Sequence, residues 1–200
     1  MEYSFNVYNR QAQEGVTTAV YQILRALDVK KTCKTGSDSA NEPPVVVCVG
    51  SDLAIGDALG PIVGSMLKYK TQGLHTYLYG TLSAPVTAKD IAYLRKFLRE
   101  THKGSTVLTV DAAVGQNGDV GLIKVLDEPL KPGAGANKKL GSIGHASILG
   151  VVNEKSLHTY GIFNTTRLNL VYTMAEIISE SIANCLWSAS ENGEKKGETA

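Results

Sequence analysis

The stretch PVVVCVG, residues 44–50, decides the fold of this 200-residue chain. Its centre, Val45–Val49, is a continuous run of apolar and mostly β-branched residues, which is typical of a strand buried on both faces of a sheet. A second run of this kind, Thr106–Val110, follows later in the chain. Because only the inner strands of a covered sheet need two apolar faces, we predict that these two strands are central neighbours in a mostly parallel sheet.

Strand and helix patterns alternate around these two runs. Further helices are predicted over Val16–Leu27, Ala58–Tyr69, Thr87–Glu100, Gly144–Val152 and Arg167–Ser188, and further strands over Leu74–Tyr79, Gly121–Leu126 and Thr159–Phe163. This alternation predicts an α/β fold: a single-domain three-layer sandwich over residues 1–189, with helices on both faces of the sheet. The polar segments Lys30–Asn41 and Ser190–Ala200 are expected to form a loop and a disordered tail.

The composition argues against several functional classes. A net charge of +1 provides no electrostatic drive toward nucleic acid or a lipid surface. No apolar run approaches the roughly 20 residues of a membrane span, and the polar N-terminus does not resemble a secretory signal. The spacing of Cys33, Cys48 and Cys185 fits no disulfide framework or zinc site. These features predict a cytoplasmic protein with no nucleic-acid or membrane partner.

Two aspartates are the best candidates for chemistry. In sheets of this class, ligands bind beyond the carboxyl ends of the strands. Asp57 lies in the loop after the first apolar run, and Asp111 directly follows the second. If the strands are neighbours, the two carboxylates come close, so that one holds a proton while the other is ionised, as hydrolysis by an activated water requires. The alternatives are a helix N-cap for Asp57 and a loop-capping role for Asp111.

A glycine-rich loop and a histidine follow. The segment Lys131–Gly141 has no P-loop pattern and predicts either a flexible clamp beside the site or an exposed surface loop. His145 is expected to begin the short helix that follows this loop. It could line the cleft, complete a metal-ligand set with Asp57 and Asp111, or be structural.

Three segments of the chain resemble the YyaC family of sporulation proteins. They are CVGSDLAIGDALGP (residues 48–61), TVDAAVG (109–115) and KPGAGANKKLGSIGH (131–145). That family resembles the spore germination protease, an atypical aspartic endopeptidase that degrades small acid-soluble spore proteins. It resembles more distantly the hydrogenase-maturation endopeptidases, which use a bound nickel ion for recognition.

The resemblance implies a hydrogenase-maturation-protease-like fold and a peptidase of the sporulating cell or the spore core. Asp57 and Asp111 would be its catalytic residues, and the substrate would be a protein, such as a spore protein. The residues implied at the substrate are Gly133, Gly135, Asn137, Lys138 and His145.

Two questions stay open under this resemblance. The germination protease needs no metal, so no cofactor is expected, whereas kinship with the maturation endopeptidases implies a divalent metal, such as nickel, held by Asp57, Asp111 and His145. The chain could also be a non-catalytic regulatory protein of sporulation that keeps the protease fold.

Overall fold

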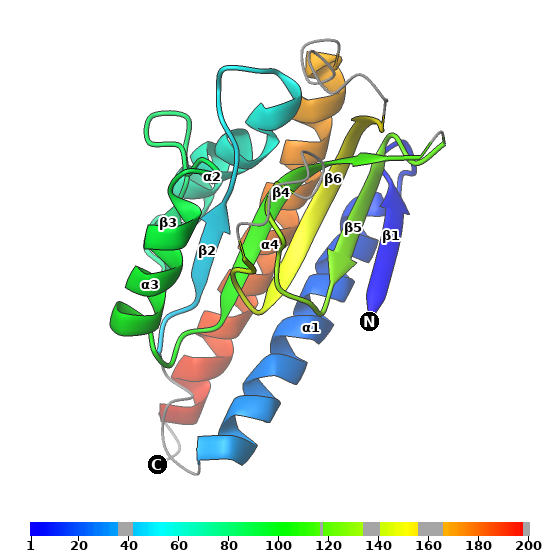
Figure 1. Cartoon of the computed structure of the whole chain (residues 1–200). Helices are drawn as coiled ribbons and strands as arrows, with labels where there is room; N and C mark the ends of the chain where they lie inside the picture. The colour runs from blue at the N-terminus through cyan, green and yellow to red at the C-terminus, as the bar shows by residue number, and fades with distance from the viewer. Residues whose placement is uncertain (36–41, 117, 134–140, 156–165, 198–200) are drawn as a thin grey trace.

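The protein forms a six-stranded sheet with strand order β1-β5-β6-β4-β2-β3. The structure is a computed structural model and describes residues 1–35, 42–116, 118–133, 141–155 and 166–197 (Figure 1). The strands are β1 (Glu2–Asn6), β2 (Val45–Cys48), β3 (Tyr77–Tyr79), β4 (Val107–Gly115), β5 (Leu122–Leu126) and β6 (Ala146–Glu154). The adjacent strands β3, β2, β4 and β6 are parallel, β5 runs antiparallel to β6, and β1 runs antiparallel to β5.

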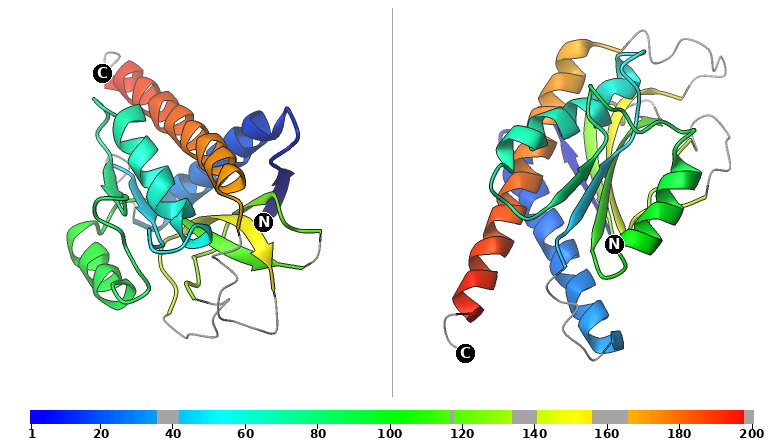
Figure 2. Two further views of the ribbon diagram at one scale, coloured as in Figure 1. Left: turned by 90° about the horizontal axis from the view of Figure 1, so that it is seen from above. Right: turned by 90° about the vertical axis from the view of Figure 1, so that its left-hand side faces the viewer.

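Helices cover both faces of this sheet. The helices α1 (Ala12–Thr35), α2 (Leu59–Lys70) and α4 (Leu168–Gly197) lie on one face, and α3 (Ile91–Thr101) lies on the other (Figure 2). Successive side chains of β2 divide between the two resulting cores: Val46 and Cys48 pack toward α1, α2 and α4, whereas Val45 and Val47 pack toward α3. No helix of the described ranges is long and apolar enough to cross a membrane.

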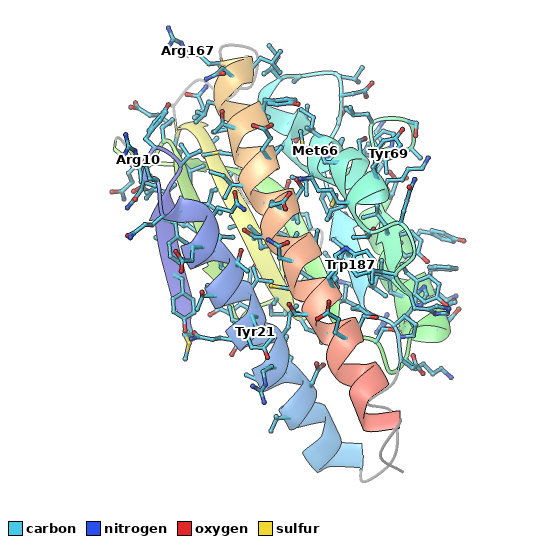
Figure 3. All side chains as sticks on the ribbon, turned by 180° about the vertical axis from the view of Figure 1, so that it is seen from behind. Arg10, Tyr21, Met66, Tyr69, Arg167 and Trp187 are labelled. Carbon is cyan, nitrogen blue, oxygen red and sulfur yellow. The ribbon has the colours of Figure 1, made fainter. Side chains whose placement is uncertain are left out.

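The long helix α4 lies between α1 and α2 on its face of the sheet (Figure 3). In the second half of α4, Trp187 Nε1 donates to the Lys70 carbonyl, at the end of α2, at 3.0 Å. On the other side, the Ser181 hydroxyl donates to the Gln13 carbonyl of α1 at 3.1 Å. Helix α4 therefore joins the two helices that flank it into one layer.

The central prediction for the sheet is confirmed. The strands β2 and β4 are interior, parallel and adjacent, with Val45 opposite Val107 and Cys48 opposite Val110. All four residues of β2 are buried, as the apolar run required. Four of the five expected helices correspond to α1, α2, α3 and α4.

One element was assigned to the wrong class. The segment Gly144–Val152 was expected to be a short helix, but it forms most of β6, which pairs with β4 on one side and β5 on the other. A short run that is apolar on both faces has no period that separates a buried strand from a buried helix. Beyond β6, β5 runs antiparallel to β6 and β1 runs antiparallel to β5. The edge strand β1 was not predicted.

The predicted ends of two helices were too early. Helix α1 continues through Thr35, so the first part of the segment expected to be a loop from Lys30 is helical, and residues 36–41 lie outside the described residues. Helix α4 continues through Gly197, which places helix where a tail was expected from Ser190. The strand expected over Thr159–Phe163 lies outside the described residues.

Candidate active site

A tight turn after β2 brings Asp57 back to the carboxyl end of β2. The Val49 amide donates to the Val110 carbonyl at 2.7 Å, and the chain then turns at Gly50, whose φ is +146°. The Ser51 amide donates to the Asp57 carbonyl at 3.1 Å, which closes the turn. A side chain on Gly50 would place its Cβ 2.1 Å from that same carbonyl oxygen, so this close approach requires glycine.

Asp57 does not cap a helix. It lies in the short 3₁₀ helix η2 (Gly56–Ala58), whose N-cap is Ile55, while the N-cap of α2 is Ala58, and neither makes a side-chain cap. The first turn of α2 packs directly on the end of β2, since a Cβ on Gly60 would lie 2.0 Å from the Val49 carbonyl oxygen. The carboxylate of Asp57 is therefore not used to begin the helix, and the N-cap alternative is wrong.

Asp111 lies within β4 and not at its end. It is the fifth of nine residues, opposite Leu149 of β6, and it follows Val110, which pairs with the last residue of β2. Its side chain is on the α3 face, the face to which Val107 also points. Asp111 is 9% exposed, and its Oδ1 accepts a hydrogen bond from the Ala112 amide at 2.8 Å.

The structure brings the two aspartates together. The 3₁₀ helix that carries Asp57 contacts β4, and the negative charge of Asp57 affects the ionisation of Asp111. Burial raises the pKa of Asp111 well above its ordinary range, and the charge of Asp57 raises it further, against a smaller lowering by the Ala112 amide. Burial also raises the pKa of Asp57, which is half-buried, and a backbone hydrogen bond from Ser51 opposes that increase.

These environments separate the pKa values of the two carboxyl groups. The more deeply buried Asp111 is the group that holds a proton, and Asp57 is the group that ionises first. Because their charges interact, the two titrate as a pair. Such a pair can supply one general acid and one general base at the same point in space.

His145 lies beside the first residue of β4, four residues before Asp111. Its amide donates to the Val107 carbonyl at 2.8 Å, and its Nδ1 accepts from the Val107 amide at 2.9 Å. Val107 is the first residue of β4, and four residues of strand span about 13 Å. His145 precedes a strand, not a helix, so it enters the sheet at the amino end of the parallel strands.

The predicted metal set is therefore not assembled. His145 is exposed at the far end of the sheet, away from Asp57 and Asp111. In the part of the chain that the structure describes, no three His, Cys, Asp or Glu side chains gather where they could hold a metal ion. The expectation that His145 completes a metal site or lines the cleft between the aspartates was wrong. The error arose because the segment after His145 was predicted to be a helix, whereas it forms strand β6.

The glycine-rich loop begins and ends on the α3 face. Leu130 and Ile143 exchange two backbone hydrogen bonds of 2.9 Å and pack into the core beneath α3. Gly141 lies against Arg95 of α3, since a Cβ there would be 1.9 Å from the arginine Nη1. Asp111 points to this same face. Among the residues expected at the substrate, Gly133 is at the edge of the described chain, and Gly135, Asn137 and Lys138 lie outside it.

Sequence reasoning missed two features of the site. The Ala112 amide donates to the Asp111 carboxylate and the Ser51 amide donates to the Asp57 carbonyl, and backbone donors leave no signature in a sequence. The turn before Asp57 also presents two exposed apolar side chains, Leu53 (90% exposed) and Ile55 (37% exposed). The sequence could have indicated this exposed apolar surface, because Leu53 and Ile55 lie in a loop between two glycines.

The chain is similar to a curated protein and to a solved structure. It is 41% identical over 145 residues, 72% of this chain and 70% of the relative, to the uncharacterized protein YyaC of Bacillus subtilis (strain 168). Among solved structures, it is similar to the [NiFe] hydrogenase maturation protease HycI from Thermococcus kodakarensis KOD1, with a TM-score of 0.46 and 18% identity. That similarity covers 79% of this chain and 98% of HycI.

A family model described as "Protein of unknown function (DUF1256)" matches residues 11–181. The matched range runs from the start of α1 to the middle of α4 and includes both aspartates. The chain therefore belongs to the DUF1256 family.

Proposed function

We propose that this protein is a peptidase that hydrolyses a peptide bond with Asp57 and Asp111. The observation that carries the proposal is a carboxyl group buried within a central strand, beside a second carboxyl group that is held on a turn closed by backbone contacts. Burying a carboxylate costs several kcal/mol, and a neighbouring like charge adds to that cost. Unfavourable arrangements of this kind cluster at functional sites.

The two environments assign the roles. Asp57 is half-buried and is the first to ionise. It takes a proton from a water molecule while the oxygen of that water attacks the carbonyl carbon of the peptide. Asp111, protonated, donates its proton to the carbonyl oxygen. When the C–N bond breaks, Asp57 passes its proton to the leaving nitrogen, and Asp111 recovers one from a hydroxyl group of the tetrahedral intermediate. Both carboxyl groups return to their initial states.

A protein substrate fits the surroundings of the pair. Leu53 and Ile55 expose apolar surface in the turn that carries Asp57, and such surface favours contact with the side chains of a peptide. The resemblance to the germination protease favours a spore protein as the substrate and sporulation or germination as the process.

A peptide library tests the proposal with no assumption about the sequence of the substrate. Purified protein is incubated with peptides from a bacterial proteome between about pH 4 and pH 8, and new termini are identified by mass spectrometry. We expect cleavage by wild type that Asp57→Asn and Asp111→Asn each reduce by at least about a thousandfold, within the range for loss of a member of a catalytic pair. Asp52→Asn is the matched control, because Asp52 is an exposed aspartate of the same turn.

The outcomes separate the competing functions. Equal cleavage by wild type and both active-site variants would assign the activity to another site or to a contaminant. No cleavage by wild type at any pH would favour the regulatory protein that keeps the fold. Activity that falls at high pH supports the pair, because both carboxyl groups are then ionised and no proton is available to donate.

A further inference from the structure

The first strand leaves an open edge on the sheet. β1 is the terminal strand, and its pairing with β5 is unbroken from Glu2 to Asn6. No other strand of the described ranges pairs with its outer side. Edges of this kind are normally protected by proline, lysine or a β-bulge, and the sequence EYSFN has none of these. Its one charged residue, Glu2, is already 3.5 Å from Lys124 of β5.

The register shows which backbone groups the edge presents. The Met1 carbonyl accepts from the Asp127 amide at 3.0 Å, and the Val7 amide donates to the Gly121 carbonyl at 2.8 Å. In an antiparallel ladder, hydrogen-bonded residues alternate with residues whose amide and carbonyl groups point away from the partner strand. The odd residues of β1 therefore bind β5, and the even residues direct their backbone groups outward, with Ser4 at the centre.

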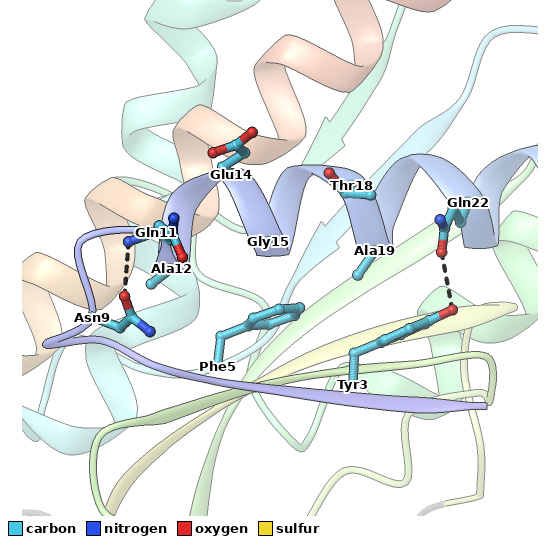
Figure 4. Close-up of a pocket in the computed structure, with 10 residues that line it drawn as sticks. All are labelled: Tyr3, Phe5, Asn9, Gln11, Ala12, Glu14, Gly15, Thr18, Ala19 and Gln22. Carbon is cyan, nitrogen blue, oxygen red and sulfur yellow. Dashed lines mark hydrogen bonds between the residues drawn. The ribbon is translucent and has the colours of Figure 1, made fainter.

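A groove of about 610 Å³ runs beside this edge, between β1 and α1 (Figure 4). Its strand side is formed by the half-buried rings of Tyr3 and Phe5. The Phe5 ring lies against the helix at Gly15, where a Cβ would be 2.4 Å from the ring. The Tyr3 hydroxyl donates to Gln22 Oε1 at 3.0 Å. The groove is formed by elements that do not carry the aspartates, so it belongs to a separate surface.

We propose that a second copy of this chain binds this edge, with the two β1 strands antiparallel about a twofold axis through Ser4. Ser4 would exchange hydrogen bonds with Ser4 of the second copy, and Glu2 would face Asn6. On the groove side, Tyr3 would face Phe5 of the second copy, and aromatic pairs across strands are stabilising. No like charges would lie opposite each other in this register. The interface would be self-complementary, as a twofold dimer requires.

The surface of α1 is complementary under the same axis. Phe5 lies beneath Gly15 and Tyr3 beneath Gln22, so α1 runs antiparallel to β1 and an axis through Ser4 passes near Thr18 (Figure 4). The groove side of α1 is lined by Glu14, Thr18 and Gln22. Its centre is therefore a small residue, which allows a second helix to approach.

Opposite charges flank that centre. Glu14 lies one helical turn before Thr18, and Arg25 lies two turns after it, on the same side of the helix. Arg25 is exposed, and its guanidinium lies 5.7 Å from the centre of the Tyr21 ring. The twofold axis brings Glu14 of each copy toward Gln22 and Arg25 of the other, so the interface contains two equivalent contacts of this kind. This charge complementarity identifies a second copy of the chain as the occupant.

The outward amide of Ser4 offers a clean test. Ser4→Pro removes an N–H group that points away from β5, so the pairing within the chain is kept, whereas Ser4→Ala keeps the N–H group. Analytical ultracentrifugation over a concentration range up to about 100 μM, within the concentrations at which specific dimers assemble, should show a dimer for wild type and Ser4→Ala and a monomer for Ser4→Pro. A monomeric wild type over this range, or a Ser4→Pro protein that dimerises as wild type does, would overturn the proposal.

Charge reversal tests the axis itself. Glu14→Arg and Arg25→Glu should each weaken dimerisation about tenfold, because each places like charges together, and the double variant should recover it. Circular dichroism confirms that every variant is folded. A folded double variant that dimerises no more tightly than the single variants would refute the twofold arrangement. These charge variants decide the question even if Ser4→Pro does not fold. The proposal does not depend on peptidase activity.

Discussion

Replacing Asp111 with asparagine should make the protein more stable while it inactivates the proposed site. The wild-type protein buries a carboxyl group that is 9% exposed, whose pKa is raised first by burial and second by the charge of Asp57. An acid whose pKa is higher in the folded state than in the unfolded state destabilises the fold as the pH rises through that interval. Asparagine cannot ionise, so it avoids this pH-dependent cost, and it keeps an oxygen that can accept a hydrogen bond from the Ala112 amide.

The size of the effect follows from the cost of a buried charge. Effective penalties are several kcal/mol per ion, and the 2.8 Å hydrogen bond from Ala112 offsets part of that penalty. We therefore expect Asp111→Asn to raise the free energy of unfolding by about 2 kcal/mol at neutral pH. For a chain of this length, that corresponds to a rise in Tm of about 4–8 °C. The gain should shrink as the pH falls toward about 4, the ordinary value for an aspartate, because the wild-type group is then protonated as well.

Thermal unfolding followed by circular dichroism between about pH 4.5 and pH 8 measures this difference. Asp52→Asn, a change at an exposed aspartate, controls for the general effect of removing one negative charge. The reasoning is refuted if Asp111→Asn is less stable than wild type at neutral pH, or if its advantage does not depend on pH. A stabilised but inactive variant would show that the site is kept at a cost in stability.

The glycines, the cysteines and His145 allow further tests of the packing. Gly60→Ala should lower the free energy of unfolding by about 3 kcal/mol in a urea titration, because its Cβ would lie 2.0 Å from the Val49 carbonyl oxygen. Gly73→Ala should cost about 1 kcal/mol, from its φ of +89° alone, since nothing lies within 4 Å of a Cβ there. In a Cys33→Ser background, Cys48 and Cys185 should not react with a thiol reagent until the protein unfolds, because burial raises the pKa of Cys185 to about 12 and that of Cys48 further still; rapid labelling of the folded protein would contradict this. His145→Ala should cost about 1 kcal/mol through the lost Val107 hydrogen bond and leave peptide cleavage unchanged; a large loss of activity at equal stability would return His145 to the site.

The aspartate pair could be predicted because two simple rules cover it. Val45–Val49 and Thr106–Val110 are apolar on both faces, which places them inside a parallel sheet, and parallel neighbours direct their carboxyl ends to one edge. Asp111 directly follows the second run, and Asp57 lies with Asp52 in the loop after the first. What the sequence could not provide was the turn of Ser51 onto Asp57, which depends on backbone hydrogen bonds.

The error at His145 shows where pattern reasoning ends. Ala146–Val152 is apolar on both faces, so its period did not distinguish strand from helix, and the resemblance then suggested a place for His145 beside the aspartates. As a strand, the segment places His145 at the amino end of β6, beside Val107. β1 was missed for a different reason: Tyr3 and Phe5 alternate with polar residues, which is the period of a half-buried strand, whereas the sheet was predicted from continuous apolar runs.

The ionisation of the two carboxyl groups is the most direct test of the proposed site. Nuclear magnetic resonance of protein labelled with ¹³C at the aspartate carboxyl carbons follows both groups as the pH changes. We predict that Asp111 titrates well above the ordinary range of aspartate, that Asp57 and Asp111 each respond to the titration of the other, and that Asp57→Asn lowers the pKa of Asp111 without returning it to the ordinary value, because burial is the larger cause. Two independent titrations near the ordinary value of aspartate, unchanged by Asp57→Asn, would contradict the paired site.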